Sequence, residues 1–102
     1  MDRLDDPRRW RRHLDDALVD LQLYQALLLL IEGHTSSEGE RGHNMGLSKA
    51  RAESVKAYLV ERGIDTSRVE TAGYGPDRPV ASNDTERDRG RNRRIEVKIL
   101  RQ

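Results

Sequence analysis

Three polar segments of the chain carry the side chains that could do chemistry. They are residues 33–39 (GHTSSEG), 44–52 (NMGLSKARA) and 83–97 (NDTERDRGRNRRIEV). Histidine, serine and the acidic residues in them are the types that metal sites and hydrolases use, and the arginines are the type that binds anions. The spacing of these residues decides which of those chemistries the chain can perform.

The histidines favour neither a metal site nor a hydrolase. His34 and His43 are nine residues apart with no third ligand at helical spacing, whereas metal sites need three or four placed ligands. A Ser–His–Asp hydrolase of the common type has a Gly-x-Ser-x-Gly elbow, which is absent. Cysteine is also absent, which excludes a thiolate metal site and a cysteine nucleophile. We therefore expect no enzyme activity, no metal and no cofactor.

Five arginines between residues 87 and 94 could in principle bind nucleic acid. They alternate with Asp84, Glu86 and Asp88, and no aromatic platform lies among them. The whole chain has 19 basic and 18 acidic residues, without the basic excess that is usual in nucleic-acid binders. We expect no nucleic-acid partner, and part of this run reads as a solvated loop with local ion pairs.

The elements that position these segments follow from hydrophobic spacing. Pro7 suits a first helical turn and is followed by apolar residues at helical spacing, so we expect a helix from about Asp6 to Tyr24. The run 26–33 is apolar on both faces and predicts a buried strand, with continuation of the helix as the alternative. Residues 34–46 contain three glycines and predict a loop.

A second helix should follow this loop. Ser48 suits its N-cap, and Gly63 is a natural stop. Its apolar stripe would consist of Ala52, Val55, Tyr58 and Leu59. Residues 68–74 predict a strand, residues 80–92 a polar loop with a short helical turn, and residues 94–99 a strand with one buried face.

This order of elements predicts one small α/β domain. Helices should pack on a small mixed sheet in a two-layer α/β (α+β) sandwich. We divide the chain into an N-terminal amphipathic helix at 1–25 and a domain body at 26–102. Without Phe and with a single Trp, the core should be aliphatic.

The sequence has no apparent export or membrane segment. The charged N-terminus lacks the apolar region of a secretory signal peptide, and the apolar run 26–31 is too short to span a bilayer. We expect no direct membrane insertion. An exported domain would need its signal elsewhere, and a fragment or a cytoplasmic relative is the alternative.

The ordered polar residues resemble the OmpA-like family of peptidoglycan-binding domains. The resemblance covers residues 31–100, and its residues are Gly33-His34-Thr35, Gly39, Asn44, Leu47-Ser48, Arg51-Ala52, Gly63, Arg68, Gly73-Tyr74-Gly75, Pro79, Asn83, Thr85, Arg89 and Asn92-Arg93-Arg94. The family includes outer-membrane porin tails, peptidoglycan-associated lipoproteins and flagellar stator subunits. It implies the OmpA-like fold and a non-catalytic bacterial module of the periplasm or cell envelope, which binds the diaminopimelate-containing peptide stem and anchors a protein to the wall.

The resemblance also implies a ligand site. Arg51 would grip the ligand carboxylate from the first turn of its helix, where backbone N–H groups would add to the anion site. Asn44 would contact the peptide backbone, Arg94 would line the same cleft, and Asn92 would brace the loop. The full set of ligand-binding residues is Thr35, Ser36, Asn44, Leu47, Arg51 and Arg94, and the supporting residues are His34, Gly39, Asn92 and Arg93. A structural ion pair between Arg51 and Glu32 is the alternative.

One departure from the family concerns the charge of this site. The family usually has Asp after Gly-His-Thr to pair with the ligand amine, and this chain has Ser36. Losing one charged partner of a partly desolvated pair costs about 2–5 kcal/mol. Glu38 or Glu40 could supply the charge from a shifted position; otherwise binding is weak or the ligand differs.

A second departure concerns the front of the domain. Family members usually begin with a strand, and no alternating strand precedes Asp5. The sheet would then have an uncovered edge, so we expect a homodimer through it or a strand supplied by a neighbour. The rival function is therefore a degenerate OmpA-like domain that acts as a dimerisation or scaffold unit.

Overall fold

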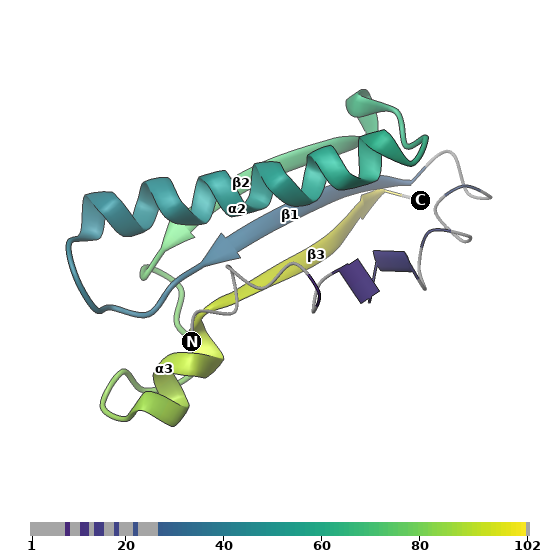
Figure 1. Ribbon diagram of the computed structural model, residues 1–102. Helices are drawn as coiled ribbons and strands as arrows, with labels where there is room; N and C mark the ends of the chain where they lie inside the picture. The colour runs from purple at the N-terminus through teal and green to yellow at the C-terminus, as the bar shows by residue number, and fades with distance from the viewer. Residues whose placement is uncertain are drawn as a thin grey trace.

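The computed structural model describes residues 27–101, together with positions 8, 11, 12, 14, 15, 18 and 22 (Figure 1). Its elements are β1 (Leu28–His34), α2 (Arg41–Glu61), the short 3₁₀ helix η2 (Thr66–Arg68), β2 (Val69–Gly75), α3 (Glu86–Asn92) and β3 (Arg94–Arg101). The predicted strand at 26–33 is confirmed as β1, so the helical alternative is excluded there. The strands predicted at 68–74 and 94–99 are confirmed as well.

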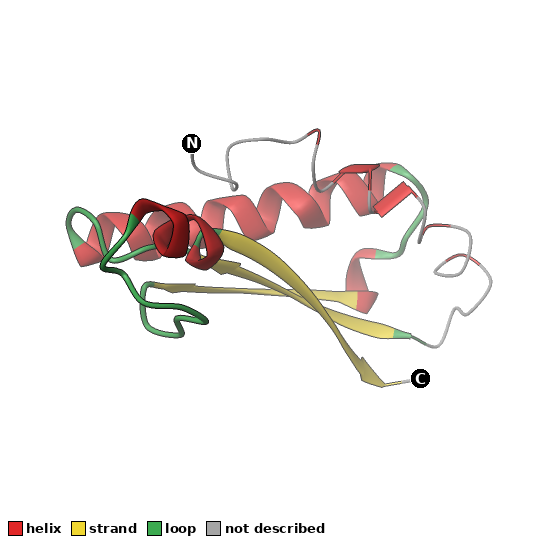
Figure 2. Cartoon of the chain, turned by 90° about the horizontal axis from the view of Figure 1, so that it is seen from below, coloured by secondary structure: helices red, strands yellow, loops and turns green. Residues whose placement is uncertain are grey.

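The three strands form one mixed sheet in the order β2-β1-β3. The central strand β1 runs parallel to β2 and antiparallel to β3. Figure 2 shows α2 lying along one face of this sheet. The predicted sandwich of helices on a small mixed sheet is therefore confirmed.

The hydrophobic core lies between α2 and the sheet. Leu29 and Ile31 of β1 are almost fully buried, as are Val55 and Leu59 of α2. Gly33 lets the two layers approach, because a Cβ atom there would lie 2.1 Å from the carbonyl oxygen of Ser48. The small residue thus sets the distance at which α2 crosses the polar end of β1.

The described N-terminal positions are all helical, whereas the bounds of the helix predicted at 6–24 lie outside the described residues. Leu14 is buried in the core cluster, and the hydroxyl of Tyr58 donates to Asp15 at 2.5 Å. These contacts attach this part of the chain to the C-terminal half of α2. The division into 1–25 and 26–102 stays a prediction.

The start of the second helix was predicted wrongly. α2 begins at Arg41, and Ser48 lies inside it rather than at its N-cap. Ser48 instead donates its hydroxyl to the Met45 carbonyl and accepts a hydrogen bond from the Gly75 backbone. Gly42 and Gly46 lower the helix propensity of these first turns, so the sequence pattern did not predict a helix that tertiary contacts stabilise. The predicted stop is confirmed, because Gly63 follows the helix with φ +95°.

The buried face predicted for the last strand is only partly present. Ile95 packs against the core, but Val97 and Ile99 are 44% and 55% exposed. They share a face with the core residues Ile31 and Leu29, which they oppose in the sheet register. Their exposure follows from their position on the edge strand β3, beyond which the described part of the chain adds no further strand.

Candidate ligand-binding site

The loop after β1, the start of α2 and helix α3 gather at one end of the sheet (Figures 1 and 2). The loop begins with Thr35, whose backbone N–H donates to the Gly75 carbonyl at 2.8 Å. Both Thr35 and Ser36 are buried, and the Thr35 hydroxyl donates to the Ser36 carbonyl. Ser36, which stands where the family usually has Asp, is therefore buried within this loop.

Asn44, in the first turn of α2, holds this loop. Its Nδ2 donates to the Glu38 carbonyl at 2.7 Å and to the Ser36 carbonyl at 3.5 Å. The side chain is buried, and its amide donors serve the protein's own backbone. A contact with a ligand peptide would therefore use the Oδ1 acceptor of Asn44.

Helix α3 and the residues before it clamp the same loop from the other side. The Ser37 backbone donates to Oδ1 of Asn83, and Nε of Arg89 lies 3.0 Å from Oε1 of Glu38. Arg93 contacts both Glu38 and Glu86 and is 8% exposed. The hydrogen bond from Arg93 lowers the pKa of Glu86 below its ordinary value. These ion pairs join two of the three polar segments of the sequence.

The two acidic residues considered as substitutes for the missing carboxylate differ in position. Glu38 faces Arg89 and Arg93, so these arginines neutralise its charge. Glu40 is exposed and occupies the N-cap position of α2 without a side-chain capping bond. Neither side chain contacts Ser36 in the described hydrogen bonds and ion pairs.

Asn92 joins the segment before α3 to β3. It is fully buried, and its Oδ1 accepts hydrogen bonds from the backbone N–H groups of Val80 and Ala81 at 2.8 and 3.0 Å. Its Nδ2 donates to the Ala81 carbonyl and to Oδ1 of Asn83. One side chain thus holds the loop that carries Asn83 toward Ser37.

Arg51 and Leu47 are half-buried on α2. Arg51 follows Asn44 by seven residues, so the two residues lie on one side of the helix, about 10 Å apart along its axis. The placement of Arg51 in the first turn was wrong, because the helix begins ten residues earlier, at Arg41. The free N–H groups of the first turn are about 15 Å away along the axis, too far to share one carboxylate with Arg51.

Arg94 lies on the opposite side of the sheet from α2. Its Nε donates to Oε2 of Glu96 at 2.6 Å, and its other nitrogens donate to the carbonyls of Asn92 and Arg78. Since Glu96 opposes Glu32 in the register, both carboxylates face away from the helix layer. A ligand that contacts both Arg94 and Arg51 would have to pass around the end of β1.

For the same reason, Glu32 is not the partner of a structural ion pair with Arg51. Glu32 is buried on the face away from α2, 3.1 Å from Nε2 of His34 and 3.3 Å from Nζ of Lys98. His34 also lies 3.7 Å from Glu96. Sequence reasoning missed this cluster, although Glu32-x-His34 and Glu96-x-Lys98 show the two-residue spacing of one strand face.

The cluster has the types of groups that could hold a metal ion, since Glu32, His34 and Glu96 converge. Lys98 and Arg94, however, already balance the two carboxylates. Burial lowers the pKa of His34, and the charge of Arg94 acts in the same direction. His34, whose pKa is lowered, thus lies between two carboxylates that are each paired with a cation.

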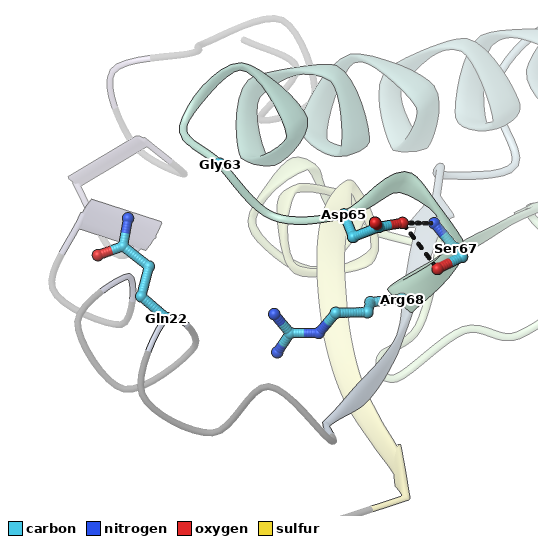
Figure 3. A pocket seen from close by; sticks show the side chains of 5 residues that line it. All are labelled: Gln22, Gly63, Asp65, Ser67 and Arg68. Atoms are coloured by element: carbon cyan, nitrogen blue, oxygen red, sulfur yellow. Dashed lines mark hydrogen bonds between the residues drawn. The ribbon is translucent and has the colours of Figure 1, made fainter.

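A polar pocket of about 490 Å³ lies at the other end of α2 (Figure 3). It is lined by Gln22, Gly63, Asp65, Ser67 and Arg68. Asp65 accepts hydrogen bonds from the backbone and the hydroxyl of Ser67. None of the predicted site residues lines this pocket.

Comparison with protein families matches residues 10–93 to the OmpA family. The chain belongs to the OmpA family. The resemblance inferred from the polar segments is thereby confirmed, and it extends further toward the N-terminus than those segments do.

Relatives of this OmpA-family domain include outer membrane protein A of Bordetella avium. The two are 43% identical over 90 residues, which make up 88% of this chain and 46% of the relative. The chain spans less than half the length of this relative and of several other curated relatives.

Solved structures share the fold. The crystal structure of the peptidoglycan-associated lipoprotein from Burkholderia pseudomallei superposes with a TM-score of 0.89 at 25% identity, covering 98% of this chain and 85% of that one. The cell wall anchor of the T6SS from Pseudomonas aeruginosa gives a TM-score of 0.78 at 26% identity, covering 92% and 68%. Within the described residues, no helix of this OmpA-family domain is long and apolar enough to cross a bilayer.

Proposed function

We propose that this OmpA-family domain is a non-catalytic module of the bacterial cell envelope that binds the diaminopimelate-containing peptide stem of peptidoglycan. In that role it would anchor a protein to the cell wall. Family membership supports the proposal, as do relatives named for association with peptidoglycan or for anchoring to the cell wall. The observation that carries it is the placement of Asn44 and Arg51 on one side of α2, where Asn44 is bonded to the loop that contains Ser36.

The geometry suits a ligand with a carboxylate. Side chains on a helix lean toward its N-terminus, so Arg51 would reach along α2 toward the side of Asn44. Its planar fork can bind a carboxylate through two parallel hydrogen bonds. Leu47 lies between Arg51 and Asn44 and offers apolar contact to the aliphatic part of a diamino acid.

The amine of such a ligand would meet a weaker partner. Ser36 offers a hydroxyl without charge, and Glu38 is engaged by two arginines. We therefore infer that the carboxylate contributes more to binding than the amine does. Recognition of this kind requires only contacts and no bond cleavage, in keeping with a non-catalytic module.

The test is a titration of the purified chain with a diaminopimelate-containing muropeptide, followed by amide shifts in NMR spectra. We expect shifts in residues 35–51 that disappear in Arg51→Ala and are weakened in Arg51→Lys, which keeps the charge but loses the fork. Arg91→Ala is the control, because it removes the same charge from an exposed position on α3. Absence of shifts at millimolar ligand would overturn the proposal.

A second candidate function is a dimerisation or scaffold unit with weak or no wall binding. Ser36 in place of a carboxylate favours it, as does the edge of β3 to which the described residues add no strand. Co-sedimentation of the chain with purified cell-wall sacculi separates the two functions, because a scaffold unit would stay in the supernatant whether or not it is dimeric.

A further inference from the structure

Asn83, in the segment between β2 and α3, holds the loop after β1 through one half of its side-chain amide. Its Oδ1 accepts hydrogen bonds from the backbone N–H of Ser37 and from Nδ2 of Asn92, both at 3.1 Å. A backbone N–H can only donate, so the oxygen and the nitrogen of the Asn83 amide are assigned without ambiguity. The two donors on one oxygen therefore fix the orientation of the whole amide group.

The other half of this amide is available to a ligand. Nδ2 of Asn83 donates no hydrogen bond within the described part of the chain. The residue is half-buried, and its Nδ2 is not among the polar atoms that are shielded from solvent without a partner. The backbone carbonyl of Asn83 is held as well, because Nη1 of Arg89 donates to it at 3.0 Å. Asn83 thus presents two N–H donors from a fixed position beside the loop.

Asn44 on α2 shows the opposite arrangement. Its Nδ2 donates to the carbonyls of Ser36 and Glu38, which leaves Oδ1 as the acceptor for a ligand. These partners are backbone carbonyls, which can only accept, so the orientation of this amide is unambiguous too. One asparagine therefore offers an acceptor to a ligand, and the other offers donors.

The two asparagines lie on opposite sides of one peptide unit of the loop. The carbonyl of Ser36 points toward Asn44 and the N–H of Ser37 points toward Asn83, since the two groups of a trans peptide unit point in opposite directions. The two hydrogen bonds and the width of the peptide unit place Nδ2 of Asn44 at most about 9 Å from Oδ1 of Asn83. An extended peptide covers this distance in about three residues.

We propose that Asn83 is a further ligand-binding residue, whose Nδ2 donates a hydrogen bond to a main-chain carbonyl of the bound peptide stem. The inference rests on the proposed function and names the group of the stem that this side chain contacts. The stem lies across the loop after β1, with one N–H donating to Oδ1 of Asn44 and one carbonyl accepting from Asn83. An extended peptide offers both kinds of main-chain group along its length. Both contacts join neutral groups, so they require no carboxylate at position 36.

Asn83→Asp separates ligand binding from the structural role of the residue. Aspartate has nearly the same shape and keeps Oδ1 as the acceptor for Ser37 and Asn92, but it replaces the Nδ2 donor with a second acceptor. We therefore expect the Ser37 amide to stay protected from hydrogen exchange. Affinity for a diaminopimelate-containing muropeptide, measured by calorimetric titration, should fall about tenfold or more, because an acceptor then faces the ligand carbonyl.

Ser82→Asp is the matched control for the added charge. Ser82 is exposed and precedes Asn83, and its hydroxyl accepts a hydrogen bond from the Asp84 backbone, which an aspartate can also accept. This variant adds a carboxylate without removing a donor from the ligand, so it should bind the muropeptide as the unchanged chain does. Asn83→Ala removes both halves of the amide and should lose the protection of the Ser37 amide together with affinity.

The side-chain amide protons of Asn83 in the unchanged chain provide a test without any substitution. They should shift in NMR spectra as muropeptide is added, whereas those of Asn92, which donate to Ala81 and Asn83, should shift less. Binding without a shift of the Asn83 protons would overturn this inference alone, and absence of all binding would overturn the proposed function as well. Retained affinity in Asn83→Asp, or an equal loss in Ser82→Asp, would show that Asn83 does not contact the ligand.

Discussion

The Nε atom of Arg89 in α3 lies 3.0 Å from Oε1 of Glu38 in the loop after β1. This contact, with that of Arg93 to the same carboxylate, joins the first polar segment of the chain to the third. Asn44 in the second segment holds the same loop through the Glu38 carbonyl. The three polar segments thus meet at Glu38, whose carboxylate serves the protein's own structure.

Glu38→Gln tests whether the Glu38 carboxylate has a structural role and does not bind the ligand. The Glu38 side chain is 58% exposed, and ion pairs of this kind contribute about 0–1 kcal/mol, so we expect a correspondingly small loss in the free energy of unfolding. Muropeptide affinity should stay within about threefold of the unchanged chain, because Glu38 is engaged by arginines. Urea denaturation and calorimetric titration measure the two quantities. A tenfold loss of affinity would instead make Glu38 the partner of the ligand amine.

Ser36→Asp should restore the charge that the site lacks. We expect affinity for a stem with a free side-chain amine to rise about tenfold or more, because a charged partner of a partly desolvated amine is worth about 2–5 kcal/mol. Without ligand, the variant should be less stable than the unchanged chain, since position 36 is only 5% exposed and burying a carboxylate is costly. Calorimetric titration and thermal unfolding give both values.

Ser37→Asp is the matched control for this gain, because it adds the same charge at an exposed neighbouring position. It should leave affinity nearly unchanged. Equal tightening by both variants would show that the gain comes from general electrostatic attraction and not from position 36.

Gly33→Ala should destabilise the fold strongly. The added Cβ would lie 2.1 Å from the carbonyl oxygen and 2.8 Å from the carbonyl carbon of Ser48, so α2 would have to move away from β1. We expect a loss of about 3 kcal/mol or more in the free energy of unfolding, at the upper end of overpacking effects. Urea denaturation measures it.

Gly46→Ala provides the contrast within α2. Nothing lies within 4 Å of its added Cβ, and the residue is in the interior of the helix. Alanine should therefore raise stability by about 0.5–1 kcal/mol. A stabilising Gly33→Ala would contradict the close packing of α2 on β1.

Acidification should destabilise the fold through His34. Burial, aided by Arg94, lowers its pKa in the folded chain below the ordinary value of 6.5. The unfolded chain therefore binds the proton first, and stability that is complete above pH 6.5 is lost as the pH falls toward the folded pKa. Carboxylates such as Glu86, with pKa lowered from 4.5, contribute only at more acid pH.

His34→Gln should flatten the dependence of stability on pH below 6.5. His43→Gln is the control, since His43 is exposed, and it should keep the slope of the unchanged chain. Denaturation midpoints across this range measure the slopes. An unaltered slope in His34→Gln would exclude His34 as the titrating group.

Local patterns were sufficient for much of the fold. The apolar run that became β1, the alternation of β3 and the stop at Gly63 depend on residues near one another in sequence, so their spacing predicted them. The start of α2 did not follow these patterns. Gly42 and Gly46 weaken helix propensity, and the Asn44 side chain, bonded to the preceding loop, supports a first turn that the sequence conceals.

The sequence by itself determined the family and the identity of the polar residues, including Ser36 where the family usually has a carboxylate. Only the tertiary structure decided how those residues are used. Strand register places Arg94 and Glu32 on the face away from α2 and assembles the His34 cluster. Sheet order leaves Val97 and Ile99 at an edge. Register and order bring together residues far apart in the chain, and no local spacing specifies such contacts.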